Sequence, residues 1–128
     1  MNDALKEKPI TYDELYEKVK KIVKPEELEI IDKAYNFALK KHANKNRLNG
    51  DSYISHPLEV ANILVDLNVD YITIACALLH ETINHTNTTT LELEEEFGEE
   101  IAHIVRSLSK INRLELSDNK DSSAQYLR

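Results

Sequence analysis

Residues 71–85 read YITIACALLHETINH, a nearly apolar run that changes abruptly to polar residues at His80 and Glu81. Asp70 stands just before the run, where a carboxylate can accept hydrogen bonds from the first turn of a helix. The run therefore predicts a helix that is buried on most sides and carries a histidine and a carboxylate near its end. That pair of side chains is a donor set for a divalent metal ion. The alternative is a helix that simply emerges into solvent, and this pattern alone leaves both open.

Asn84 and His85 extend the polar end of the same helix. If the helix continues, residues 80 and 84 lie one turn apart on one side, and residues 81 and 85 one turn apart on the adjacent side. These four side chains are then predicted to crowd a single cavity. The HExxH motif of zinc proteases is excluded, because its histidines are four residues apart whereas His80 and His85 are five apart. We expect His56, which follows an irregular loop, to face this helix end.

Amphipathic helices are predicted on both sides of the buried run, over residues 11–23, 25–42, 57–67, 89–97 and 99–116. Thr11 and Thr89 each precede a glutamate by three residues, which is a helix-start signal, and Gly98 is a helix-stop signal. In the second helix the residues predicted to face inward are Leu28, Ile31, Tyr35, Ala38 and Leu39. The pattern indicates an all-α bundle of about five to six helices.

The composition limits the chain to one acidic domain. It has 128 residues, a net charge of −7 and a hydrophobic content of 41%. Only two glycines and three prolines are present, which is too few for most β-rich folds. The two glycines are also too far apart to form a glycine-rich phosphate loop. Cys76 is the single cysteine, which excludes an internal disulfide and favours core packing. We predict a cytoplasmic protein that binds neither nucleic acid nor membrane.

Positive charge is concentrated just before His56, where the sequence places Lys40, Lys41, Lys45 and Arg47. An anionic ligand would be drawn to such a cluster in an acidic protein. Arg47 offers a planar fork for phosphate and a flat face for a base, although a solvated basic turn is the alternative interpretation.

Three other side chains near the loop or the helices are interpreted separately. Tyr53 is predicted either to wall the ligand pocket or to pack beneath the loop. His42 and His103 are predicted to face solvent and are excluded from the site.

Three segments together resemble a known family: HANKNRLNGDSYISHPLEVANIL (42–64), ACALLHETINHT (75–86) and LELEEEFGEEIAHIVRSLSKI (91–111). They are similar, in order, to the N-terminal HD-type hydrolase domain of RelA/SpoT (p)ppGpp synthetase/hydrolases, over about residues 34–128. The resemblance implies an all-helical HD fold with one divalent ion, typically manganese. It also implies hydrolysis of the 3′-pyrophosphate of guanosine tetra- or pentaphosphate.

Carried over by position, the resemblance implies metal ligation by His56, His80 and Glu81. It implies that Arg47 packs on the guanine base. Lys45, from the positive cluster, and Tyr53 are the further candidates for substrate binding.

The sequence departs from the family pattern at three places. Glu81 stands where the family has aspartate. Asn84 and His85 stand where it has a Glu-Asp pair that acts on water, so they are the candidate catalytic residues here. The family's fourth ligand, a downstream aspartate, has no match in the chain, because Asp118 and Asp121 do not fit its motif.

These departures lead to a leading prediction and three alternatives. We expect an N-terminal helix over residues 1–24 and a partial HD-type domain over 25–128, degenerate or truncated, with hydrolysis weakened or lost. A synthetase domain is the expected partner in a longer polypeptide. The first alternative is an active manganese-dependent hydrolase that uses Glu81 and His85. The others are a non-catalytic, nucleotide-binding regulatory module and an HD phosphohydrolase acting on another nucleotide.

Overall fold

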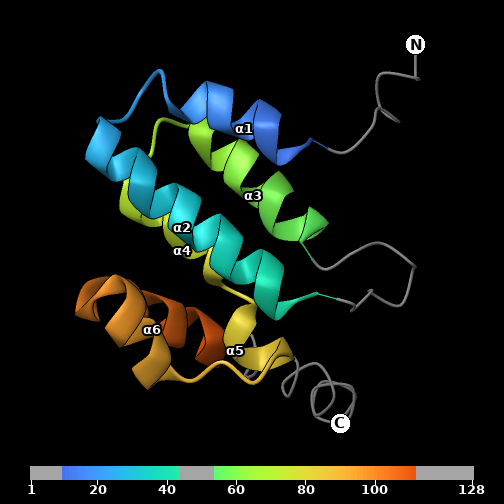
Figure 1. Cartoon of the computed structure of the whole chain (residues 1–128), viewed down its shortest axis with the longest axis vertical. Coiled ribbons are helices and arrows are strands. Elements are labelled where there is room, and N and C mark those ends of the chain that lie inside the picture. The colour runs from blue at the N-terminus through green and yellow to red at the C-terminus, as the bar shows by residue number, and fades with distance from the viewer. Residues whose placement is uncertain (1–9, 44–53, 112–128) are drawn as a thin grey trace, which may run out of the picture.

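The structure, a computed structural model, describes residues 10–43 and 54–111. The elements are α1 (Tyr12–Val19), α2 (Pro25–Lys41), α3 (Ser55–Asp66), α4 (Tyr71–Leu79), α5 (Thr82–His85) and α6 (Thr90–Phe97). Residues 99–111 are also helical, and these described ranges contain no strand. In Figure 1, α1 to α4 form one part of the molecule, and α5, α6 and helix 99–111 gather at one end of it. The all-α prediction is confirmed.

The helix boundaries follow from local signals in the sequence. Thr11 caps α1 in a reciprocal box with Glu14, and Pro25 is the first residue of α2. Thr89 accepts a hydrogen bond from the backbone of Glu92 at the start of α6. Gly98 ends α6 with a φ of +91°, a backbone region that L side chains rarely adopt. These predicted starts and stops are confirmed.

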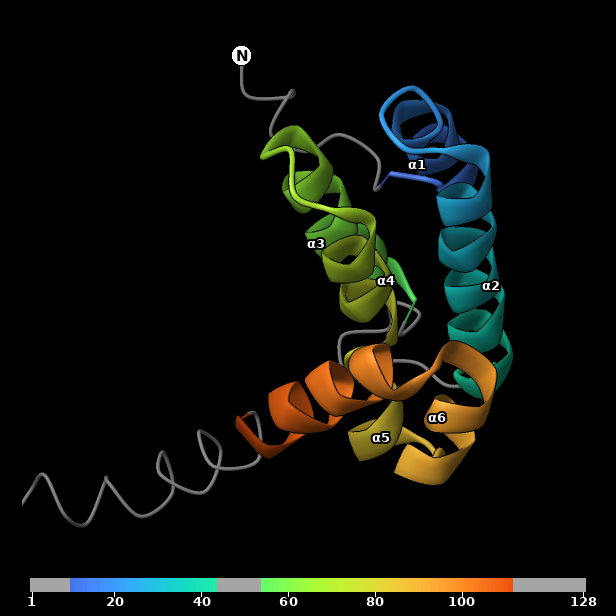
Figure 2. The same ribbon diagram turned by 90° about the vertical axis from the view of Figure 1, so that its left-hand side faces the viewer.

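Helix α4 lies at the centre of the core, packed against both α2 and α3. Figure 2 shows the three helices from the side, with helix 99–111 beneath them. Every residue from Ile74 to Leu79 is buried, which confirms the prediction from the apolar run. Cys76 is a free thiol within this core, and burial, followed by the charges of Asp70 and Glu100, raises its pKa to about 12. Its predicted packing role is confirmed.

Some expectations from periodicity are wrong. Helix α1 ends at Val19, and α3 begins at Ser55, two residues before Pro57. Leu39 is 42% exposed, and His42, predicted to face solvent, is only 3% exposed.

The positions of buried residues in α2 account for Leu39 and His42. The buried stripe runs through Ile31, Ala34 and Ala38. His42 follows Ala38 by one turn and lies on the inner face, whereas Leu39 lies beside that stripe. His103 is exposed, as predicted.

None of the helices in the described ranges is long and apolar enough to cross a lipid bilayer.

The cap at Asp70 gives a prediction for stability. Its carboxylate accepts hydrogen bonds from the backbone N–H of Thr73 at 2.9 Å and from the Thr73 hydroxyl at 2.7 Å. Replacing Asp70 with alanine is expected to lower the free energy of unfolding by about 1 kcal/mol at pH 7, the usual effect of losing such a cap. Urea unfolding followed by circular dichroism measures this difference.

The same carboxylate predicts a pH dependence. The hydrogen bond from the Thr73 side chain, followed by that from its backbone, lowers the pKa of Asp70 from its ordinary value of 3.8. Because the folded pKa is depressed, this stabilisation is complete above the unfolded pKa and is lost as the pH falls through the folded one. Asp70→Asn, which can also cap a helix, should retain most of the stability at pH 7 without this acid-dependent loss. Equal acid sensitivity of Asp70→Asn and the parent would contradict the assignment.

Candidate metal centre

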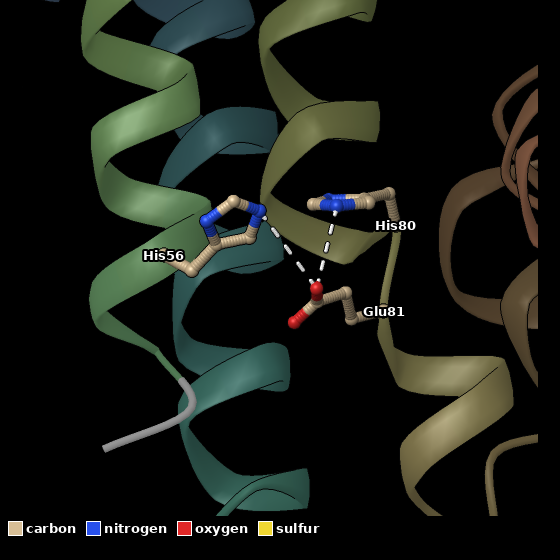
Figure 3. Close-up of side chains that lie close together, drawn as sticks. All are labelled: His56, His80 and Glu81. Carbon is tan, nitrogen blue, oxygen red and sulfur yellow. Dashed lines mark ion pairs between the residues drawn. The ribbon is translucent and has the colours of Figure 1, made fainter. Parts of the chain in front are cut away.

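Three donor side chains meet where α3 begins and α4 ends. His56 is the second residue of α3, and His80 is the residue that caps the C-terminus of α4. Glu81 follows directly and precedes α5. Because α3 and α4 pack against each other, His56 and His80 come together although they are 24 positions apart in the sequence. Figure 3 shows both imidazoles and the Glu81 carboxylate turned toward a common point.

The distances within this group match a shared cation. The Nε2 atoms of His56 and His80 each lie 3.8 Å from Oε2 of Glu81, and the two ring centroids are 5.7 Å apart. One ligand atom from each residue lies within 4.8 Å of the other two. Ligands placed about 2.0–2.2 Å from one ion are separated from each other by about 2.9–4.3 Å. The group is thus too open for direct hydrogen bonds and of a suitable size to hold a divalent metal ion.

The backbone of α4 fixes the orientation of the His80 ring. Nδ1 of His80 lies 2.6 Å from the carbonyl oxygen of Ala77. A carbonyl oxygen can only accept a hydrogen bond, so Nδ1 is assigned as the donor, and Nε2 is the ring nitrogen that faces Glu81. Metal-binding histidines are typically held in this way by a hydrogen bond from the other ring nitrogen.

The side chains of Glu81 and His80 are largely buried, whereas that of His56 is partly exposed. The side chain of Glu81 is 10% exposed and that of His80 is 15% exposed. A carboxylate removed from water in this way is destabilised unless a cation or hydrogen bonds compensate it. The His56 side chain is 42% exposed, which leaves one side of the group accessible to a ligand from solvent.

Asn84 and His85 follow this group along the chain, but the single continuous helix predicted to carry all four side chains is wrong. The helix breaks after Leu79, where the N–H of His80 bonds to Ala77 instead of to the residue four positions back. The hydroxyl of Thr82 donates to the Leu79 carbonyl at 2.8 Å, a local bond that competes with helix continuation.

Beyond the break, the two side chains have other surroundings. The Asn84 amide is hydrogen-bonded to Ser109, and His85 is exposed. The substrate-binding candidates Lys45, Arg47 and Tyr53 lie outside the described residues. The catalytic and binding roles expected for these five residues stay predictions.

An apolar cavity of about 350 Å³ adjoins His80, a feature that was not expected from the sequence. Its lining comes from α3, α4 and helix 99–111, and consists of Val60, Leu64, Thr73, Cys76, Ala77, His80, Ile104 and Leu108. The sequence contains a signal for this cavity, because the apolar pairs Val60/Leu64 and Ile104/Leu108 each have the spacing of one helical turn. The volume lies within the range of small-ligand pockets, about 300–1,000 Å³.

Comparisons with known proteins give consistent matches. The model of the HD domain family matches residues 34–127. GTP pyrophosphokinase rsh of Brucella ovis is 46% identical over 116 residues, which is 90% of this chain and 15% of that protein. Guanosine-3′,5′-bis(diphosphate) 3′-pyrophosphohydrolase of Aquifex aeolicus is 42% identical, over 80% of this chain and 15% of that protein. The bifunctional (p)ppGpp synthase/hydrolase SpoT of Escherichia coli is 32% identical, over 91% and 17% respectively. The chain therefore spans about one-sixth of the length of these relatives.

Proposed function

Because this chain belongs to the HD domain family and is an HD domain of the RelA/SpoT type, we propose that it acts on (p)ppGpp as a 3′-pyrophosphohydrolase domain with weakened hydrolysis. The observation that carries the proposal is the convergence of His56, His80 and Glu81, with Nε2 of His80 directed toward the carboxylate. Two imidazoles and a carboxylate bind a divalent ion well, and a nucleoside polyphosphate is a substrate that needs one.

We propose that the ion is Mn²⁺ and that His56, His80 and Glu81 hold it. When bound, such an ion supplies the Lewis acidity that favours attack by water and offsets the negative charge on the leaving pyrophosphate. The protein orients the ligands: the Ala77 carbonyl holds His80, and the packing of α3 on α4 places His56 opposite. The exposed side of His56 is where we expect the phosphates to approach.

Weakened hydrolysis follows from the residues after Glu81. The carboxamide of Asn84 cannot accept a proton as a general base, and it is engaged with Ser109. His85 is exposed, and of Asn84 and His85 it is the remaining candidate for the general base. Loss of a general base typically lowers a rate by about a hundred- to ten-thousand-fold.

The test is turnover of ppGpp by the purified chain with Mn²⁺, followed as released pyrophosphate. We expect slow turnover, at least about 100-fold below that of the matching segment of the Aquifex aeolicus relative, because the general base is replaced. His80→Ala should abolish it. Turnover equal to that of the relative would contradict the weakening, and neither turnover nor ppGpp binding would contradict the whole proposal.

The second candidate function is a regulatory module that binds nucleotide without hydrolysis. The engagement of Asn84 with Ser109 favours it, because this removes one of the two predicted catalytic groups. Its signature is ppGpp binding without turnover that is abolished by Arg47→Ala but kept in Glu81→Ala.

We also propose a role within a larger assembly and a cellular location. Since one relative is named as a bifunctional synthase/hydrolase and the chain spans only part of its length, we propose a synthetase domain as the partner. The free thiol of Cys76 supports a cytoplasmic location.

A further inference from the structure

One polar pair joins the segment after the metal centre to a distant helix. Asn84 in α5 donates from Nδ2 to the backbone carbonyl of Ser109 at 3.2 Å. The hydroxyl of Ser109 donates back to Oδ1 of Asn84 at 2.7 Å. Ser109 is only 1% exposed and Asn84 is partly buried, so this reciprocal, part-buried pair joins α5 to helix 99–111.

The pair requires a carboxamide at position 84. One atom of that side chain must donate, because its partner is a carbonyl oxygen, and the other must accept, because its partner is a hydroxyl. An aspartate of the same size would place a second oxygen against the Ser109 carbonyl. A buried carbonyl and hydroxyl that lose their partners each carry a desolvation penalty, so Asn84 is matched to this place.

The segment that carries the metal centre depends on external support. Glu81 immediately precedes α5, which has only four residues, and His80 and Glu81 lie in the break between α4 and α5. A four-residue helix has little stability of its own. Within α5, Thr82 bonds back to Leu79, whereas Asn84 reaches across to another helix. Movement of α5 would shift the carboxylate of Glu81 relative to the two imidazoles.

We infer that Asn84 and Ser109 form a lock that fixes α5 on helix 99–111 and so positions Glu81 and His80 for the cation. Asn84 is then a positioning residue and does not act on substrate. The inference depends on one part of the proposed function, namely that His56, His80 and Glu81 form a metal centre. Residues that orient metal ligands typically change metal affinity by about 10- to 100-fold when they are replaced.

The first experiment titrates Co²⁺ into the chain and its variants, following the visible absorption of the ion. Asn84→Ala and Ser109→Ala should each weaken Co²⁺ binding by about tenfold or more and change the shape of the spectrum. The double variant should lose no more than either single one, because both remove the same pair. Asn84→Asp should not rescue binding.

Two control variants separate positioning from general stability. Ser107→Ala, on the same helix and outside the pair, should leave Co²⁺ affinity within about twofold. Ile101→Val removes a methylene from the core and should lower the melting temperature without changing the Co²⁺ spectrum. Unchanged Co²⁺ affinity and spectrum in Asn84→Ala would overturn the inference.

A second measurement needs no metal and keeps the two proposals distinguishable. The Nδ1 proton of His80, held by Ala77, should exchange with solvent at least about tenfold faster in Asn84→Ala than in the parent, measured by NMR. If the parent does not bind Co²⁺, the metal centre is rejected. The lock still stands in that case if the His80 Nδ1 proton exchanges faster in Asn84→Ala than in the parent. Unchanged exchange would reject the lock.

Discussion

Replacing Glu81 with glutamine is expected to lower the affinity for Mn²⁺ by more than about 100-fold, beyond the range typical of residues that only orient a ligand. The imidazoles of His56 and His80 bind as neutral ligands, so Glu81 supplies the negative charge of this group of three. Its Oε2 lies 3.8 Å from Nε2 of each histidine, where a glutamine would offer a weak, uncharged oxygen or an amide that repels the cation. Titration of Mn²⁺ followed by electron paramagnetic resonance of the free ion measures the affinity directly.

Glu81→Asp is the matched control, because it keeps the charge and changes only the reach of the carboxylate. With the shorter side chain, the backbone must move slightly closer to the ion. The Mn²⁺ affinity of Glu81→Asp should therefore remain within about tenfold of the parent, a smaller loss than that of Glu81→Gln. Both variants should keep the helical circular dichroism of the parent. Equal Mn²⁺ affinity for Glu81→Gln and the parent would show that the ion, if bound, lies elsewhere.

The sequence predicted the elements whose signals are local. The apolar run before His80 predicted α4, and the caps at Thr11, Asp70 and Thr89 predicted three helix starts, because a capping bond joins residues only two or three positions apart. Gly98 predicted the end of α6 for the same reason.

The features that the sequence did not predict depend on contacts between distant segments. The break after Leu79 accompanies a bond from Asn84 to Ser109, 25 residues away, which periodicity within one helix cannot report. The burial of His42 depends on where the inner face of α2 meets its neighbours. The proximity of His56 to His80 was expected from position and resemblance, and it arises from the packing of α3 on α4.

Replacing Leu78 with alanine is expected to lower the free energy of unfolding by about 3–5 kcal/mol. Leu78 is 0% exposed and lies in α4, the helix that packs against both α2 and α3. The substitution removes buried methyl groups and leaves a cavity that close-packed neighbours fill only in part. Since small domains are stable by about 5–15 kcal/mol in total, this single change should remove a large share of that stability. Urea unfolding followed by circular dichroism gives the value.

Ile63→Ala is the control, since Ile63 is an aliphatic residue on the neighbouring helix α3 with 59% exposure. Ile63→Ala should lower the free energy of unfolding by less than about 1 kcal/mol, because most of the Ile63 side chain is already in water. The comparison also bears on the metal centre: α4 ends at the residue before His80, so a loosened α4 should weaken Mn²⁺ binding in Leu78→Ala but not in Ile63→Ala. Similar losses of stability in the two variants would contradict α4 as the centre of the core.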